Sequence, residues 1–126
     1  MNSTSKIVVI DDTSEILELI EVVLEDEGYE VIRCQDQTQA LGIVIAEQPS
    51  LVIIDLRMAG VSQWELVDTI FTHQQTARVP VIVCSGAVAE LHQAEARLKS
   101  LGGDILVKPF DIQALLSKVK RLLPAS

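Results

Sequence analysis

Five polar residues stand at the ends of apolar runs in this sequence. Asp11 and Asp12 end "KIVVIDD", and Asp55 ends "LVIID". A hydroxyl, Ser85, closes "VPVIVCS", and an amine, Lys108, closes "DILVK". Three carboxylates brought together cannot all be ionised unless cations balance them, and Lys108 supplies only one positive charge. If these residues meet in the fold, the site therefore calls for a bound cation.

The acids are suited to a hard divalent ion. Mg²⁺ prefers oxygen ligands, few carboxylates and several waters, and Mn²⁺ is an alternative. We expect Asp12 and Asp55 to bind the metal directly, with the backbone carbonyl of Arg57 as a third protein oxygen. Asp11 would act through water. The site has no cluster of His or Cys that would indicate zinc.

The same residues indicate phosphoryl transfer to a carboxylate. Next to a metal and the Lys108 ammonium, Asp55 becomes an available nucleophile, and carboxylates do form aspartyl-phosphates. Metal and ammonium would neutralise the phosphoryl oxygens, and Ser85 would donate a hydrogen bond to one of them. Gly86 has no side chain, so backbone N–H groups could approach the phosphoryl group.

These residues must be positioned by strands that alternate with helices. The Val- and Ile-rich runs that we interpret as strands are 6–11, 29–34, 51–55, 79–85 and 104–108. Continuous apolar runs are typical of strands covered on both faces, and hence of a parallel sheet. We expect an α/β, flavodoxin-like doubly wound (βα)5 three-layer sandwich. We adopt for it the strand order 2-1-3-4-5, which is the usual order of that fold type.

A parallel sheet has the carboxyl ends of all its strands at one edge. Ligands bind there, at the point where the strand order reverses. The expected order places the first and third strands on either side of this point. The topology therefore predicts that the three acids, Ser85 and Lys108 converge on one site.

Helix boundaries are also marked in the sequence. Thr13, Ser62 and Asp111 are plausible N-caps, because their side chains can accept a hydrogen bond from the first helical turn. Gly28 and Gly102 are plausible stops, because glycine readily adopts the left-handed conformation that ends many helices.

Composition narrows the range of partners. The net charge of the 126-residue chain is −8; residues 1–30 hold nine of the 18 acids and residues 97–126 hold six of the ten bases. An acidic chain is a poor candidate for direct nucleic-acid binding. No segment approaches the roughly 20 apolar residues of a membrane span, so we expect a cytoplasmic protein without membrane contact. The basic C-terminal helix is either a solvated face or a surface for an acidic partner.

The two cysteines, Cys34 and Cys84, are expected to be free thiols. The strand order places them three strands apart, about 14 Å, which is too far for a disulfide.

The sequence resembles the receiver domains of two-component response regulators, in particular the single-domain chemotaxis type, over about residues 5–123. Four segments in order carry the resemblance, namely "VVIDD" (8–12), "LVIIDLRM" (51–58), "VPVIVCSG" (79–86) and "LVKPF" (106–110). The resemblance implies that the phosphoryl group comes from a phosphohistidine on a sensor histidine kinase or a histidine phosphotransfer protein.

The resemblance also implies a role for each matching residue. Asp55 would be the phosphoacceptor, and Asp11 and Asp12 the metal-binding acids. Ser85 would be the switch hydroxyl and Lys108 the phosphate-binding lysine. A cis peptide bond before Pro109 is a further implication.

Three positions depart from the family pattern. Ile105 stands where receivers usually carry an aromatic switch residue, and isoleucine cannot make the aromatic in-and-out swing. Ala59 replaces a frequent proline, from which we expect a looser loop after Asp55. Gln63 replaces a glycine, from which we expect a different turn into the next helix.

Three side chains near the expected phosphoryl group have possible secondary roles. Arg57, two residues after the acceptor, and Ala87, two after Ser85, are at places that affect hydrolysis in the family. Ala87 leaves room for water, and Arg57 would either shield the site or hold phosphoryl oxygens. Trp64 is a candidate fluorescence reporter.

We therefore expect one receiver domain over residues 1–126, with no output domain, that catalyses only its own phosphorylation and dephosphorylation and is not otherwise an enzyme. Phosphorylation would shift the surface formed by the fourth helix, fifth strand and fifth helix. That surface would contact an unknown downstream protein, and the chain would be a monomer or a weak dimer through it. One alternative is a receiver-like interaction module that is not phosphorylated, which Ile105 favours. Another is an aspartate-dependent phosphatase, for whose cap this short chain has no room.

Overall fold

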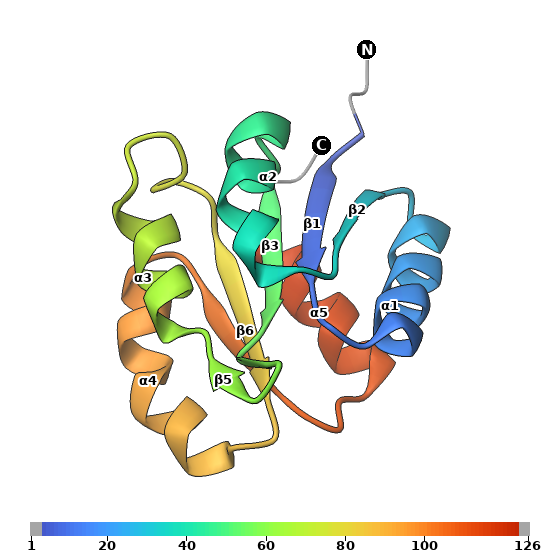
Figure 1. Cartoon of the computed structure of the whole chain (residues 1–126). Coiled ribbons are helices and arrows are strands. Elements are labelled where there is room, and N and C mark those ends of the chain that lie inside the picture. The colour runs from blue at the N-terminus through green and yellow to red at the C-terminus, as the bar shows by residue number, and fades with distance from the viewer. Residues whose placement is uncertain (1–3, 124–126) are drawn as a thin grey trace.

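A five-stranded parallel sheet forms the centre of the computed structural model, which describes residues 4–123 (Figure 1). The sheet order is β2-β1-β3-β6-β7, which is the predicted order 2-1-3-4-5. Each strand lies within its predicted range. The strands are β1 (Lys6–Ile10), β2 (Glu30–Cys34), β3 (Leu51–Asp55), β6 (Val81–Ser85) and β7 (Asp104–Val107).

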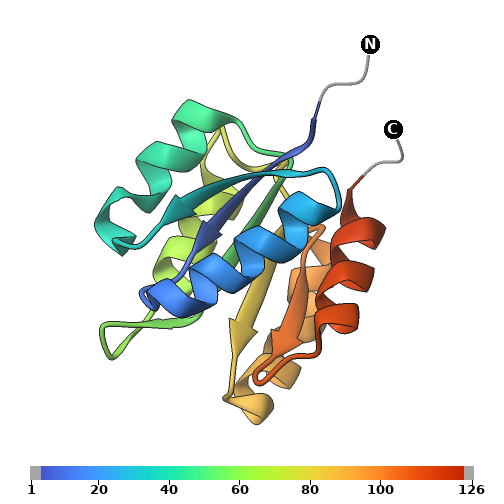
Figure 2. The same ribbon diagram turned by 90° about the vertical axis from the view of Figure 1, so that its right-hand side faces the viewer.

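Helices cover both faces of this sheet, as a three-layer sandwich requires. One face packs against α1 and α5, and the other against α2, α3 and α4 (Figure 2). The helices are α1 (Ser14–Asp26), α2 (Ala40–Glu47), α3 (Trp64–Thr72), α4 (Val88–Ser100) and α5 (Ile112–Leu122), and the 3-10 turn η1 (Gln37–Gln39) precedes α2. Among residues 4–123, no helix has the length and apolar character needed to cross a membrane.

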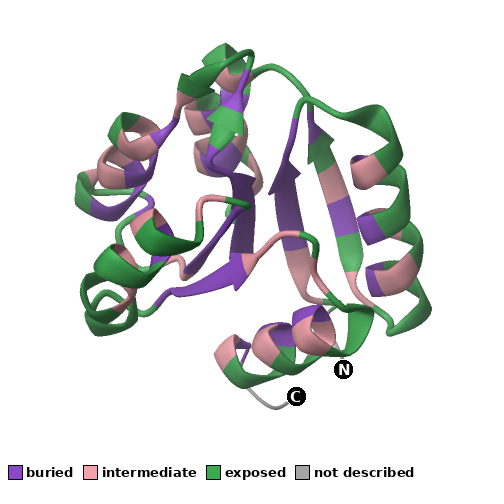
Figure 3. Ribbon diagram, turned by 90° about the horizontal axis from the view of Figure 1, so that it is seen from below, coloured by how far each residue is buried: buried purple, intermediate pink, exposed green. Residues whose placement is uncertain are grey.

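The continuous apolar runs reflect burial on both sides of the sheet. In β1, Ile7 and Val9 pack under α1 and α5, whereas Val8 and Ile10 pack under the opposite helices. Every residue of β3 and β6 is buried, and Figure 3 shows these strands in the buried colour. Burial of each Val, Leu or Ile side chain of these strands stabilises the fold by roughly 1.5–3 kcal/mol.

Two of the predicted N-cap positions are confirmed and one is wrong. Asp111 caps α5, because its Oδ1 accepts a hydrogen bond from the Gln113 N–H at 2.8 Å. Thr13 occupies the N-cap position of α1, but its side chain makes no capping hydrogen bond. Ser62 does not cap α3, because it belongs to a short strand; Gln63 takes the N-cap position instead.

The predicted glycine stops are confirmed. Gly28 and Gly102 follow the last residues of α1 and α4 with φ values of +93° and +89°. The next amides reach back into the helices, from Tyr29 N to Leu24 O at 3.1 Å and from Gly103 N to Leu98 O at 2.7 Å. This is the Schellman arrangement, which satisfies carbonyls at the helix end.

Candidate functional site

Three carboxylates meet where β1 and β3 end. Asp11 and Asp12 directly follow β1, and Asp55 is the last residue of β3, the neighbouring strand. One oxygen from each carboxylate lies within 4.8 Å of the others. The structure therefore brings together the three acids that the sequence analysis selected.

Lys108 joins two of these acids. Its Nζ is 3.2 Å from Asp11 Oδ2 and 3.3 Å from Asp55 Oδ2. The backbone N–H of Lys108 donates a hydrogen bond to the Ser85 carbonyl at 2.8 Å. This bond fixes Lys108 at the end of β7, beside β6. One ammonium thus faces three carboxylates, and the surplus of negative charge favours a further cation.

Burial and charge change the proton affinities of the site. Burial raises the pKa of Asp55, the Lys108 ammonium opposes this, and the Asp11 carboxylate adds to it, so the pKa lies above its ordinary value. Burial lowers the pKa of Lys108, but the charges and hydrogen bonds of Asp11 and Asp55 outweigh burial and raise it overall. Lys108 therefore remains an ammonium, and Asp55 holds a proton more tightly than an ordinary aspartate does.

Backbone N–H groups anchor each acid. Asp11 Oδ1 accepts from Thr13 N at 2.9 Å, and Asp55 Oδ1 accepts from Arg57 N at 3.3 Å. Asp12, the exposed member, accepts from Ala59 N at 2.8 Å, which connects the loop after β1 to the loop after β3.

The loop after β3 is a small hairpin that the sequence analysis missed. β4 (Arg57–Met58) and β5 (Val61–Ser62) pair antiparallel, and Ala59 and Gly60 turn between them with φ values of +52° and +73°. The expectation that Ala59 loosens this loop is not supported, because the loop is hydrogen-bonded. Proline would suit position 59 poorly here, since its φ is fixed near −65° and it has no N–H to donate to Asp12.

The other departure in this loop, Gln63, lies directly before α3, and a turn different from that of the family stays a prediction. Gln63 is buried, and its N–H donates to Leu56 O at 2.7 Å while its side chain donates to Val61 O at 3.1 Å. The turn into α3 is thus held by a side-chain contact that a glycine could not make. Ser62 is part of the hairpin rather than a cap because it pairs with Arg57.

Ser85 and Gly86 lie at the end of β6, next to β3. The Ser85 hydroxyl is buried and its Oγ accepts a hydrogen bond from Ala87 N at 3.0 Å. A Cβ built on Gly86 would meet only the Lys108 carbonyl, at 3.7 Å, which is an ordinary contact. Packing therefore does not require glycine at position 86, and its role toward a phosphoryl group stays a prediction.

Ile105 and Arg57 point in different directions. Ile105 is buried on β7 in the core shared with α4, including Leu91 and Leu98. Arg57 extends outward, and its Nη2 lies 3.5 Å from Glu90 Oε1 on α4. The peptide bond before Pro109 is cis, as the resemblance implied.

Asp104 is a buried acid that the sequence analysis did not single out. It is fully buried at the start of β7, where its Oδ2 contacts Arg121 and lies 3.5 Å from the Lys118 Nζ. Its sequence signal was an acid at the start of an apolar strand, with bases on the following helix. Lys120 also has a partner within the chain, Glu27 at 3.1 Å. These pairs weaken the interpretation of α5 as a free basic surface for an acidic partner.

The cysteines are structural. Cys34 and Cys84 are both free and buried. Burial raises the pKa of Cys84 to about 12, so its thiol is protonated and unreactive at neutral pH.

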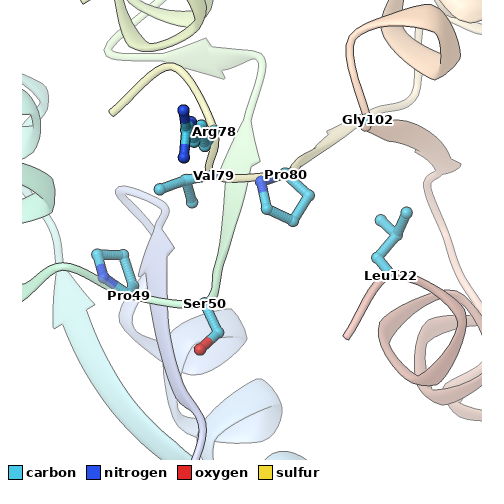
Figure 4. Close-up of a pocket in the computed structure, with 7 residues that line it drawn as sticks. All are labelled: Pro49, Ser50, Arg78, Val79, Pro80, Gly102 and Leu122. Atoms are coloured by element: carbon cyan, nitrogen blue, oxygen red, sulfur yellow. The ribbon is translucent and has the colours of Figure 1, made fainter. Parts of the chain in front are cut away.

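A shallow cavity of about 520 Å³ lies at the amino ends of the strands, opposite the carboxylate site. It is lined by residues that precede β3, β6 and β7, together with Leu122 (Figure 4). Its polar side chains are Ser50 and Arg78, and none of its lining residues is acidic. This cavity is therefore separate from the carboxylate site.

Comparison with known proteins agrees with this geometry. Residues 7–120 match the family model described as the response regulator receiver domain. Sporulation initiation phosphotransferase F of Bacillus subtilis is 31% identical over 120 residues, which cover 94% of each chain. The chemotaxis response regulator CheY4 of Vibrio cholerae has a similar structure, with a TM-score of 0.82 and 26% identity over 96% of this chain and 100% of CheY4.

Longer relatives match as well. The transcriptional regulator RpaA of Synechocystis is 29% identical over 118 residues, or 94% of this chain and 48% of RpaA. This chain thus spans about half the length of that relative.

Proposed function

Because the chain belongs to the response regulator receiver domain family, whose members are phosphoacceptor signalling domains of two-component systems, we propose that Asp55 accepts a phosphoryl group. The observation that supports this best is the position of Lys108, whose ammonium lies between Asp11 and Asp55. An ammonium there can bind a phosphoryl oxygen as soon as the transfer begins.

The donor would be a phosphohistidine on a sensor kinase or a histidine phosphotransfer protein. A carboxylate oxygen of Asp55 attacks phosphorus, the P–N bond to the imidazole breaks, and the imidazole leaves with the bonding electrons. The product is an acyl phosphate on Asp55. Lys108 balances the charge of the transferred group, and Ser85, whose Oγ accepts from Ala87 N, donates its hydroxyl proton to a phosphoryl oxygen.

The carboxylates fit Mg²⁺, or Mn²⁺ as an alternative. The donors are hard oxygens that lie within 4.8 Å of one another, and they exceed the single ammonium in charge. Asp11, Asp12, Asp55 and the Arg57 carbonyl would hold the ion. When bound, the metal supplies positive charge that offsets the charge on the phosphoryl oxygens.

The consequence of phosphorylation would be a population shift at the surface of α4, β7 and α5, read by a downstream protein or by a second copy in a weak dimer. Hydrolysis of the acyl phosphate by water would reset the protein. Arg57 and Ala87 border the acceptor, and we propose that they set the rate of this step.

Intact-protein mass spectrometry tests the proposal. After incubation with acetyl phosphate and Mg²⁺, the wild type should gain one phosphate, Asp55→Asn should gain none, and the exposed-site control Asp26→Asn should behave as wild type. A phosphate that persists on Asp55→Asn would place the acceptor elsewhere.

A second candidate is an interaction module that is not phosphorylated. Ile105 favours it, because this buried aliphatic residue takes the place of the family's mobile aromatic. In that case the wild type would remain unmodified in the same experiment.

A further inference from the structure

Arg57 contacts both the acceptor and a neighbouring helix. Its backbone N–H lies 3.3 Å from Asp55 Oδ1, and its guanidinium lies 3.5 Å from Glu90 Oε1 in the first turn of α4. The side chain of Arg57 is 57% exposed, so this ion pair is screened by water and weak. A stronger anion near Asp55 would therefore compete for the guanidinium.

Glu90 also binds a third element. Its Oε2 accepts a hydrogen bond from Trp64 Nε1 at 2.8 Å, and Trp64 opens α3. One carboxylate thus links the hairpin after the acceptor, the start of α3 and the start of α4. An open hollow of about 430 Å³ between α3 and α4 is lined by Trp64 and Glu90.

We infer that Glu90 is a positioning residue that binds the Arg57 guanidinium while Asp55 is unmodified and releases it to the phosphoryl group when Asp55 is phosphorylated. The inference rests on the proposed function. A phosphoryl group carries about −1.5 to −2 charge with three acceptor oxygens, against −1 on Glu90, and the planar guanidinium suits phosphate geometry. Arg57 then turns from Glu90 to the phosphoryl oxygens, and Glu90 is left with Trp64 as its partner.

Through this exchange, phosphorylation of Asp55 affects the start of α4 without any movement of residue 105. Loss of the Arg57 contact removes the restraint between the hairpin and the first turn of α4. Ile105 is packed in the core and makes no contact that this exchange requires. The start of α4 therefore responds to the charge on Asp55 through a surface ion pair instead of through an aromatic swing.

Trp64 makes the exchange measurable, because it is the only tryptophan in the chain. Its emission is recorded before and after addition of acetyl phosphate and Mg²⁺, and phosphate occupancy is measured by mass spectrometry on the same samples. The wild type should show a change in emission. At equal occupancy, that change should be at least about twofold smaller in Arg57→Ala and in Glu90→Gln, because the competing charges are absent.

Arg97→Ala is the matched control. Arg97 pairs with Asp68 at 2.9 Å across the same two helices but does not contact the acceptor loop, so this variant should keep the full change. A full-sized change in phosphorylated Arg57→Ala, or an equal loss in Arg97→Ala, overturns the inference and leaves the proposed function intact. A wild type that gains no phosphate overturns both.

Discussion

Asp55 is the residue whose surroundings set the chemistry. It ends a strand that is buried on both faces, and its carboxylate shares one ammonium with Asp11. Its position is tolerated because Lys108 and the Arg57 N–H compensate part of its charge. The negative charge that remains uncompensated favours a bound metal ion or a reaction of the carboxylate.

The first prediction concerns pH. Because the folded pKa of Asp55 is raised, mainly by burial, the folded protein binds protons more tightly than the unfolded chain. Stability therefore falls as pH rises from the ordinary aspartate pKa through the raised one. In metal-free buffer Asp55→Asn should be more stable than wild type at pH 7, and this advantage should disappear below the ordinary pKa. Urea unfolding at both pH values measures it; an advantage that is independent of pH would argue against this account.

The second prediction concerns Arg57. Its ion pair with Glu90 is exposed, so Arg57→Ala should change the free energy of unfolding by less than about 0.5 kcal/mol. Removal of a side chain that, by the inference above, turns to the phosphoryl oxygens should shorten the lifetime of the phosphoprotein roughly threefold, which corresponds to about 0.6 kcal/mol in the barrier. Decay can be followed by mass spectrometry after the donor is removed. Equal lifetimes of wild type and variant would show that Arg57 does not govern hydrolysis.

At the scale of elements, β7 is held more tightly than its length suggests. Gly103 precedes it, and a Cβ at this position would lie 2.3 Å from the backbone carbonyl of Val81 on β6. Asp104, the first residue of β7, is tied to α5 through Arg121 and Lys118. Both contacts fix the strand that delivers Lys108 to the site.

A pair of glycine variants tests this tight approach. Gly103→Ala should destabilise the fold by about 1–3 kcal/mol, because the backbone of β6 cannot move away without loss of packing. Gly42→Ala, in α2, meets nothing within 4 Å and should be stabilising by about 0.5–1 kcal/mol. Chemical unfolding of the two variants should move in opposite directions; a neutral Gly103→Ala would mean that the strands separate easily.

The buried acid of β7 gives a further test at this scale. Replacement of both Lys118 and Arg121 by glutamine leaves Asp104 buried without a cation, and loss of a buried partner typically costs about 3–5 kcal/mol. Lys120→Gln breaks only a surface pair with Glu27 and should cost less than about 1 kcal/mol. Urea midpoints of the two variants compare these costs. Similar midpoints would show that Asp104 needs no counterion.

At the scale of the whole molecule, the sheet order was the step that made the site predictable. Parallel strands share one carboxyl edge, so Asp11, Asp55 and Lys108 had to meet once the order was adopted. The apolar runs were sufficient for the strands because burial on both faces leaves a strong pattern.

The hairpin and the contacts between helices left no hydrophobic pattern in the sequence. Two-residue strands carry no periodicity, so the hairpin of β4 and β5 was missed and Ser62 was wrongly assigned as a cap. The contacts of Glu90 depend on how far α3 and α4 lie apart and on the conformations of long side chains. Spacing along a sequence does not specify either.

The proposed metal site depends on the fold of the whole molecule, because the carboxylates that would hold the ion come from separate loops. Mg²⁺ should raise the midpoint of thermal unfolding of the wild type. At a free Mg²⁺ concentration one hundred times the dissociation constant, binding adds about 2.7 kcal/mol to the free energy of unfolding. Asp12→Asn, at the exposed ligand, should lose most of this gain while retaining the fold. Thermal unfolding in MgCl₂ and in KCl of equal ionic strength separates binding from screening. An identical response of both proteins would remove Asp12 from the metal site.

The hydrogen bond from the Ala59 amide to Asp12 ties two loops that are far apart in the chain. It forms only while residue 59 keeps its left-handed backbone and residue 12 keeps an acceptor. A substitution at residue 59 that forbids a positive φ or removes the N–H would therefore release the loop after β3 from the loop after β1.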